Sequence, residues 1–168
     1  HLPHTPFRLQ SRAEIQLPPA VDNSTQKFFP PILDQMGVSC AQASGIGYMF
    51  TYEVNRLLDR DAHASADHRF SYQFSWNLLN DGQDQGDFVD QGLYLSERYG
   101  TMTEQDYGTS GTYQFKWATG YDKYYKAQQY RTQEVLTFAD SIPLMKRWLY
   151  DAGDGSAAGG VLTFSAMS

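Results

Sequence analysis

The clearest periodic pattern of apolar residues lies between residues 40 and 58. Ala43, Ile46, Phe50, Val54 and Leu57 recur at steps of three or four, which is the spacing that places side chains on one face of an α-helix. The pattern predicts a long helix from Cys40 to Leu58 that turns this face towards the core.

Three more helices are predicted further along the chain. The segments "SYQFSWNLLN", which begins at Ser71, and "DFVDQGLYLSERYG", which ends at Gly100, both repeat apolar residues at helical spacing, and glycine commonly follows a helix C-terminus. In "SIPLMKRWLYDAG" Ser141 is the expected N-cap, Pro143 lies in the first turn and Gly153 is the expected stop. After it, "GGVLTFS" predicts a β-strand.

The other end of the chain has a different character. Residues 1–33 contain six prolines and little periodicity, so we expect an extended arm laid across a surface. The expected organisation is an arm over 1–33, a helical part over 34–135, and a helix and a strand over 136–168. Helices first and a strand last predict an α+β protein.

Composition and charge narrow the classes of function. With 168 residues, 41% of them hydrophobic, the chain can bury one sizeable core. Nineteen acidic residues against thirteen basic ones, with no basic block, argue against a nucleic-acid partner. No apolar run approaches the roughly 20 residues that span a bilayer, so no membrane span is expected. The start "HLPHTPFRL" has no signal-peptide pattern, and an exported protein whose signal had been removed would look the same.

Three polar segments are candidate binding sites. "NDGQDQGD" lacks the alternating acidic residues of a calcium loop, and "DRDAHASADH" matches no known spacing of metal ligands, so a solvated loop is favoured there. Tyr121, Tyr124, Tyr125 and Tyr130 could stack on bases or sugars, but a tyrosine-rich loop that covers the helical core is the favoured interpretation. We predict no metal site and no cofactor.

The only cysteine stands in the stretch "DQMGVSCAQASG". Ser39 followed by Gln42 fits a capping box, which would make Ser39 the N-cap and Cys40 the first helical residue. Unpaired amide groups and the helix dipole stabilise a thiolate there. Gln35 could fold its amide back beside the sulfur and donate to a developing oxyanion. A small buried cysteine with no chemical role is the alternative.

Four segments in this order resemble the papain-like cysteine peptidases. They are "PPILDQMGVSCAQASGIGYMFTYEVN", "FSYQFSWNLL", "DGQDQGDFVDQGLYLSERYG" and "GTMTEQDYG". They are similar to that family's segment around the nucleophile, the start of its second helix, its glycine-containing turn with the third helix, and its G-hydrophobic-x-x-E segment. The resemblance covers residues 28–110, and the segment from Ile142 to Phe164 is similar to the start of the family's β-rich half.

The resemblance implies a fold and a set of roles. The fold would be the papain-like α+β fold, mostly its helical lobe with a long central helix, carried by residues 34–135, while residues 136–168 would open an incomplete β-rich lobe. Cys40 would be the nucleophile, Gln35 would help to form the oxyanion hole, and the turn around Gly82, Gln85 and Gly86 would hold the substrate. The absence of the family's disulfide cysteines suggests a bacterial branch.

The chain departs from the family pattern at several positions. The step from Gln35 to Cys40 is five residues where the family has six, Ala41 replaces an aromatic residue, and Gln85 replaces one glycine of a pair. The four histidines, His1, His4, His63 and His68, do not lie in the context of the family's catalytic histidine. A disordered or removed part of the domain, a second chain that supplies the base, and a non-catalytic relative all remain open.

Two functions follow. One is a cysteine peptidase that hydrolyses peptide bonds through a Cys40 thioacyl intermediate, with peptides or proteins as substrates. The other is an inactive papain-like domain that serves as a binding or structural component of a larger surface assembly. For either function, the expected location is outside the cell, in the periplasm or at the cell surface.

Overall fold

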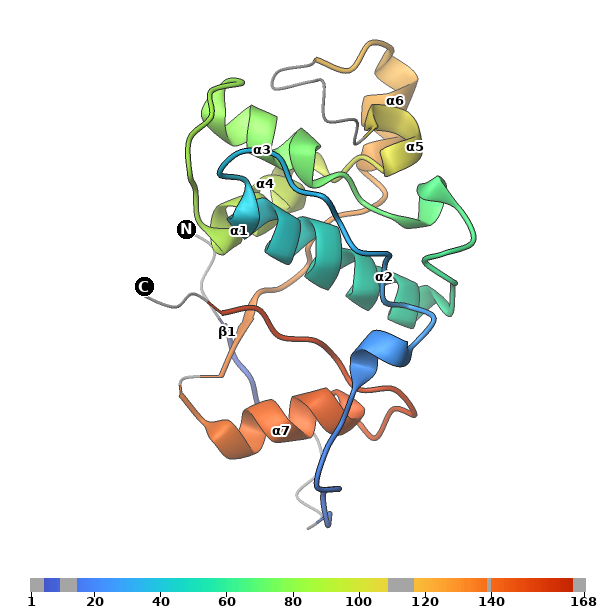
Figure 1. Ribbon diagram of the computed structural model, residues 1–168, viewed down its shortest axis with the longest axis vertical. Helices are drawn as coiled ribbons and strands as arrows, with labels where there is room; N and C mark the ends of the chain where they lie inside the picture. Colours follow the sequence, from blue (N-terminus) through green and yellow to red (C-terminus); the bar gives the residue numbers. More distant parts are fainter. Residues whose placement is uncertain (1–4, 10–14, 109–116, 139, 165–168) are drawn as a thin grey trace.

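One helical run crosses the centre of the molecule and the other helices are arranged around it (Figure 1). The computed structural model describes residues 5–9, 15–108, 117–138 and 140–164. In chain order its elements are β1 (Thr5–Pro6), the 3₁₀-helix η1 (Asn23–Thr25), α1 (Cys40–Gln42), the π-helix η2 (Ala43–Phe50), α2 (Thr51–Leu58), the 3₁₀-helix η3 (Ala66–His68), α3 (Tyr72–Asn80), α4 (Val89–Tyr99), α5 (Glu104–Tyr107), α6 (Tyr121–Ala127), β2 (Leu136–Thr137) and α7 (Ile142–Asp151).

The predicted long helix is confirmed as the continuous run of α1, η2 and α2, but its middle is π-helical. The Thr51 amide donates to the Ile46 carbonyl, five residues back, which is the π-helical bond. A π-helix turns less per residue than an α-helix, so the buried face is displaced along the run. Ala43, Ile46 and Phe50 are buried as predicted, whereas the prediction for Leu57 is wrong, because its side chain is 74% exposed.

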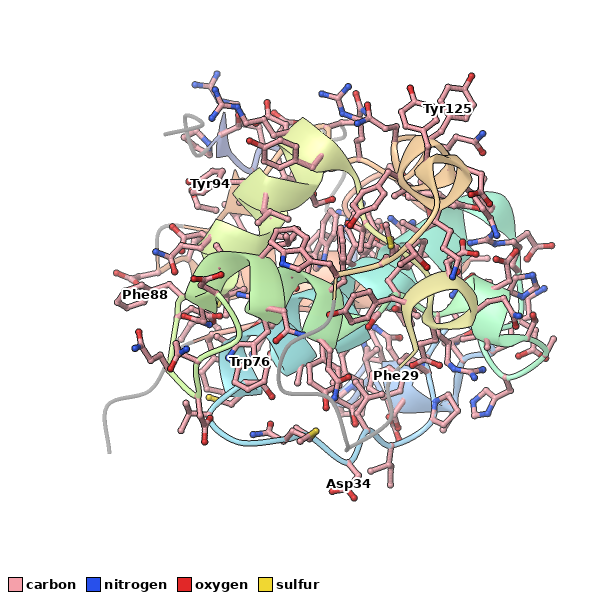
Figure 2. The ribbon with its side chains drawn as sticks, turned by 90° about the horizontal axis from the view of Figure 1, so that it is seen from above. Phe29, Asp34, Trp76, Phe88, Tyr94 and Tyr125 are labelled. Carbon is pink, nitrogen blue, oxygen red and sulfur yellow. The ribbon has the colours of Figure 1, made fainter. Side chains whose placement is uncertain are left out.

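The helices α3 and α4 confirm two of the predictions and pack against η2. Trp76 of α3 is fully buried, and Figure 2 shows it within the molecule while Phe88 and Tyr125 point outwards at its edge. The helix α4 ends before Gly100, whose φ is +78°. A Cβ at Gly100 would lie 2.0 Å from the carbonyl oxygen of Ala127, so this turn requires glycine both for its backbone angle and for its close approach.

Two apolar clusters form the core. The first joins Ile46, Phe50, Phe70 and Leu93, and the second joins Phe74, Met102, Tyr107 and Ala127. Two of the four tyrosines of the predicted tyrosine-rich loop extend these clusters, since Tyr130 packs against the first and Tyr124 against the second. The loop itself is a correction, because residues 121–127 form the short helix α6.

The helix α7 confirms the last helical prediction, with Ser141 at the N-cap position and Pro143 in the first turn. The helix stops one residue before the predicted end. Ala152 takes the left-handed conformation at φ +53° and Gly153 follows at φ +77°. Two consecutive residues with positive φ therefore reverse the chain at this point.

The predicted strand over 159–165 is wrong for its described part, because residues 159–164 belong to no strand. Its backbone is instead bonded to side chains and to a helix end. The Gly159 carbonyl accepts from the Tyr52 hydroxyl (2.7 Å), the Val161 amide donates to the Glu53 carboxylate (3.0 Å) and the Val161 carbonyl accepts from Trp148 Nε1 (2.9 Å). These partners satisfy the Gly159 carbonyl and both backbone groups of Val161, so this part of the segment needs no neighbouring strand.

The sheet found among the described residues has two strands that no periodicity predicted. β1 and β2 pair in parallel, with Thr5 opposite Leu136 and Pro6 opposite Thr137. The fold is therefore mostly helical with a small parallel sheet, which agrees with the general α+β class. None of the helices in the described ranges is long and apolar enough to cross a membrane.

Candidate active site

Cys40 is the first residue of α1 and its side chain is exposed. The structure places it at the entry of the central helical run, as the sequence predicts. An exposed thiol at this position can meet a substrate without any movement of the core. The alternative of a small buried cysteine is therefore wrong.

The predicted capping box is wrong, although Ser39 does occupy the N-cap. The Ser39 hydroxyl donates to the Met36 carbonyl (2.6 Å), and the Gln42 amide donates to the Asp87 carboxylate and to the Phe88 carbonyl (3.0 Å each). Both side chains are fully buried, so tertiary partners outweigh the local bonds of a cap. The first turn of the helix consequently has no side-chain cap, which leaves its amide groups to bind another acceptor.

Gln35 lies in the turn that leads to Cys40. Its Nε2 is 3.5 Å from the Gly37 carbonyl oxygen, and its side chain is exposed. The amide is thus directed into the turn, at the long limit of a hydrogen bond. Rotation of the exposed Gln35 side chain is enough to free its amide for another acceptor.

The turn before Cys40 is fastened to the loop between α3 and α4. The Val38 amide donates to the Asp84 carboxylate at 2.9 Å. Gly37 has φ +52°, and a Cβ there would lie 2.1 Å from Asp84 Oδ1. Glycine is therefore required both by the left-handed backbone and by the close approach of the carboxylate.

Side chains of α3 also contact the turn before Cys40. The Met36 amide is 3.2 Å from the Tyr72 hydroxyl oxygen, and Gln73 Nε2 lies 3.3 Å from the Met36 sulfur. Tyr72 and Gln73 are buried. Two buried side chains of α3 therefore fix the position of the turn before Cys40.

The predicted substrate-binding residues Gly82, Gln85 and Gly86 lie in this adjoining loop. Gly82 follows the C-cap of α3 at φ +72°, and the Gln85 carbonyl accepts from Trp76 Nε1 at 3.0 Å. A Cβ at Gly86 would meet no atom within 4 Å. The structure therefore brings the Cys40 turn and the 82–86 loop together, with Gly86 at an open position.

Asp87 anchors the far end of the loop. Its two carboxylate oxygens accept from Gln42 (3.0 Å) and from Asn80 (3.2 Å). Burial raises the pKa of the Asp87 carboxyl, and these two hydrogen bonds partly offset that rise. Gln42 lies two residues beyond Cys40, so the helix that carries the thiol and the loop beside it share a buried polar contact.

Sequence reasoning missed Asp84, Asp87 and Gln42 as parts of this site. The sequence interpretation of "NDGQDQGD" concerned a calcium loop, which was rejected, and a substrate-binding glycine turn, and gave its acidic residues no role. Its acidic residues instead accept hydrogen bonds from an amide at residue 38 and from a side chain at residue 42. Pairings across more than forty residues leave no periodic signal in a single sequence.

The two histidines that the structure describes lie at the other end of the central helical run. His63 and His68 follow α2, and a helical run from Cys40 to Leu58 is about 27 Å long at roughly 1.5 Å per residue. His68 Nδ1 is 2.8 Å from the Asp61 carbonyl oxygen. His1 and His4 lie outside the described residues. Neither His63 nor His68 can serve as the base for Cys40.

The polar segment "DRDAHASADH", residues 59–68, makes contacts other than metal ligation. Within the described ranges, no group of three or more His, Cys, Asp or Glu side chains could hold a metal ion. Asp67 pairs with Lys126 at 2.5 Å, and the hydrogen bond from Lys126 lowers the pKa of Asp67. The segment therefore connects η3 to α6.

No family model, no curated protein and no solved structure matches the chain at a significant level. The papain-like resemblance stays a prediction that rests on the four sequence segments.

Proposed function

We propose that the protein is a cysteine peptidase of the papain-like type in which Cys40 is the nucleophile. The observation that carries the proposal is the bond between the Val38 amide and the Asp84 carboxylate, which joins the turn before an exposed Cys40 to the 82–86 loop. A substrate can bind along the two adjacent loops, and the exposed thiol of Cys40 is then available for attack on it.

The reaction is acyl transfer. The Cys40 thiolate attacks the carbonyl carbon of the peptide bond, and the amide groups of the uncapped first turn, with that of Cys40 nearest, stabilise the oxyanion. The amine leaves with a proton from the base, and water then hydrolyses the thioester and restores the thiol. Gln35 is the second oxyanion donor once its exposed amide rotates away from Gly37.

The substrate binds in an extended conformation along the loop. Gly86 has no side chain and no close neighbour, so a peptide can approach its backbone directly. The Gln85 carbonyl is already bonded to Trp76, which fixes the loop and leaves the hydrogen bonds to the substrate to Gly86 and its surroundings.

The general base that would deprotonate the Cys40 thiol is not found among the described residues. The proposal assigns it to a histidine of a second chain or of a part of the protein beyond the described ranges. Such a histidine must bring a ring nitrogen to within about 4 Å of the Cys40 sulfur to take its proton.

A catalytically inactive papain-like domain that binds peptides within a larger surface assembly is the second candidate. Two observations favour it: the Gln35 amide is directed at the Gly37 carbonyl, and His63 and His68 lie beyond the far end of α2. For both candidates, export from the cytoplasm remains part of the proposal.

The test is hydrolysis of a library of fluorogenic peptides, compared between the wild type and Cys40→Ser. The peptidase proposal predicts turnover by the wild type and a loss of at least about a thousandfold in the variant. Peptide binding without turnover by either protein favours the inactive domain. Turnover that survives in Cys40→Ser contradicts the assignment of the nucleophile.

A further inference from the structure

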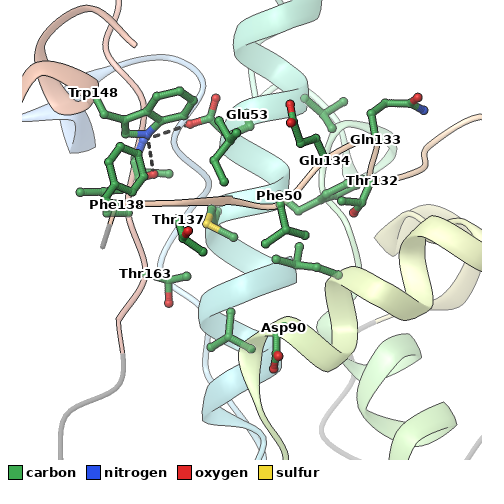
Figure 3. A pocket seen from close by; sticks show the side chains of 18 of the residues that line it. Phe50, Glu53, Asp90, Thr132, Gln133, Glu134, Thr137, Phe138, Trp148 and Thr163 are labelled. Carbon is green, nitrogen blue, oxygen red and sulfur yellow. Dashed lines mark hydrogen bonds between the residues drawn. The ribbon is translucent and has the colours of Figure 1, made fainter. Parts of the chain in front are cut away.

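A second candidate site lies along the central helical run, and Cys40 is not among the residues that line it. It is a pocket of about 560 Å³ between that run, α4, and two extended segments, residues 131–138 and 161–164 (Figure 3). A pocket of about 300–1,000 Å³ is of the size that holds a peptide segment or a small ligand. Phe50, Val54 and Leu93 are among the apolar residues that line it.

Three large apolar side chains at this pocket remain in solvent. Leu57 is 74% exposed, Phe88 is 68% exposed and Phe164 is 86% exposed, and all three line the pocket. Each comes from a different element: α2, the start of α4 and the end of the described chain. Apolar side chains gathered around one hollow mark a surface that a partner covers.

One wall of the pocket is an unpaired strand edge. β2 pairs with β1 through bonds from the Thr5 amide to the Val135 carbonyl (3.0 Å) and from the Phe7 amide to the Thr137 carbonyl (2.8 Å). Since backbone groups alternate along a strand, the amide and carbonyl of Leu136 point away from β1. Within the described sheet, which contains only β1 and β2, no strand pairs with that edge.

The opposite wall is also extended chain. Residues 161–164 are held by Glu53 and Trp148 at one end and by the contact of Thr163 with Ser44 (2.7 Å) at the other. The pocket is therefore bounded by two extended segments over an apolar floor, which is the shape that accepts a strand.

The pocket presents the exposed carboxylate of Glu134, which can pair with a basic residue of a partner. Its lining holds the carboxylates of Glu53, Asp90 and Glu134 against the guanidinium groups of Arg56 and Arg131. Arg56 is already paired with Glu53 at 2.9 Å, and Arg131 donates to the Glu97 carbonyl at 2.6 Å. A lysine or arginine of a partner can approach the exposed Glu134, and the guanidinium of Arg131 is also exposed, so competition with an anionic apolar ligand is part of the test.

We infer that this pocket binds an extended peptide that adds a strand to the free edge of β2. The peptide turns alternate apolar side chains onto Phe50, Val54 and Leu93, bonds its backbone to Leu136, and carries a basic residue near Glu134. The inference goes beyond the proposed peptidase function and does not depend on the chemistry of Cys40.

The test uses Cys40→Ser protein, so that binding is measured without hydrolysis and the result is separate from that of the peptidase assay. The probe is a fluorescein-labelled heptapeptide of alternating valine and threonine with a lysine at each end, and binding is followed by fluorescence anisotropy. A second peptide of the same sequence has alternate backbone amides N-methylated. Palmitate is the competing apolar ligand.

Adjacent residues of α2 provide the matched variants. Leu57 lines the pocket and Leu58, 54% exposed, is not among its lining residues. We expect Leu57→Asp to raise the dissociation constant at least about tenfold, because a carboxylate is costly against apolar groups, and Leu58→Asp to change it less than about twofold. N-methylation should weaken binding by at least about tenfold through the lost backbone bonds.

Each other outcome overturns the inference. Absence of peptide binding contradicts it, as does equal binding of the N-methylated peptide, since strand addition needs the free amides. Displacement of the peptide by palmitate, or an equal effect of the two leucine variants, shows that the pocket is a non-specific apolar site. Circular dichroism of both variants checks that their helices are intact.

Discussion

The amide of Val38 and the carboxylate of Asp84 meet at 2.9 Å and join two loops that are forty-six residues apart in sequence. One loop leads into Cys40 and the other contains the predicted substrate-binding residues. The contact therefore converts two separate sequence segments into one surface beside the thiol.

Removal of the Asp84 carboxylate should release the turn. In Asp84→Ala the Val38 amide loses its acceptor, and we expect its hydrogen exchange to accelerate by about three- to tenfold, which corresponds to one lost hydrogen bond. Exchange measured by NMR or mass spectrometry checks this. Asp84→Asn retains an acceptor oxygen and should keep most of the protection, whereas unchanged exchange in Asp84→Ala would show that the contact is absent in solution.

Gly37→Ala should lower the free energy of unfolding by about 1–3 kcal/mol, through the left-handed backbone and the approach of Asp84. Gly86→Ala is the matched control, because a Cβ there meets nothing within 4 Å. Urea denaturation of both variants makes the comparison. A similar loss at the two positions would argue against the close approach of Asp84 to Gly37.

The double variant Gly37→Ala/Asp84→Ala separates the two causes. It removes the carboxylate that the new methyl group would meet and leaves only the backbone cost. We expect it to be more stable than the sum of the two single changes predicts, since residues in contact are not additive. Strict additivity would show that the two residues do not touch.

We expect Tyr52 to make the stability of the folded protein fall at alkaline pH. It is fully buried and its hydroxyl donates to Gly159, and burial, with a further contribution from the Glu53 charge, raises its pKa from 10.0 to about 12. The folded protein keeps a proton that the unfolded chain releases near pH 10. Stability that is fully present below pH 10 is therefore lost as the pH rises towards about 12.

Tyr52→Phe should destabilise the protein by about 1–2 kcal/mol at pH 7, because the buried Gly159 carbonyl loses its donor. The variant should also lose less stability than the wild type between pH 10 and pH 11, since the titrating group is gone. Thermal unfolding across this range measures both effects. Tyr125→Phe, at an exposed position, is the control and should behave as the wild type does.

The sequence predicted the helices better than their surroundings. Apolar spacing identified α3 and α4, because each buries one face and the 3.6-residue period records that face directly. The helix α7 was identified by its end signals, Ser141, Pro143 and Gly153. The same spacing wrongly predicted that Leu57 is buried. A π-helical stretch shifts the buried face relative to the 3.6-residue period, and no residue type indicates that a π-helix will form.

Polar partners chosen from distant parts of the chain account for the other errors. The Ser39 and Gln42 side chains fitted a local capping box, yet burial directs them to Met36 and to the loop at Asp87. Likewise "GGVLTFS" has the composition of a strand, but the side chains of Tyr52, Glu53 and Trp148 bond its backbone. Local patterns cannot reveal such bonds, because the partners lie far away in the sequence.

The position of Cys40 was predictable from the short polar turn before an apolar helix, and the structure exposes it there. What the pattern could not supply is the neighbour that completes the site. The bond from Val38 to Asp84 depends on the relative placement of the central helical run and α3, which only the folded chain determines.

The rate at which iodoacetamide alkylates Cys40 at pH 6 is the most direct test of the central claim. Because the chain has one cysteine, the mass increase reports this residue alone. The proposed role of Cys40 as the nucleophile predicts that the folded protein reacts at least about tenfold faster than N-acetylcysteine and than the same protein unfolded in urea. A folded protein that reacts no faster than either reference contradicts an activated nucleophile at Cys40.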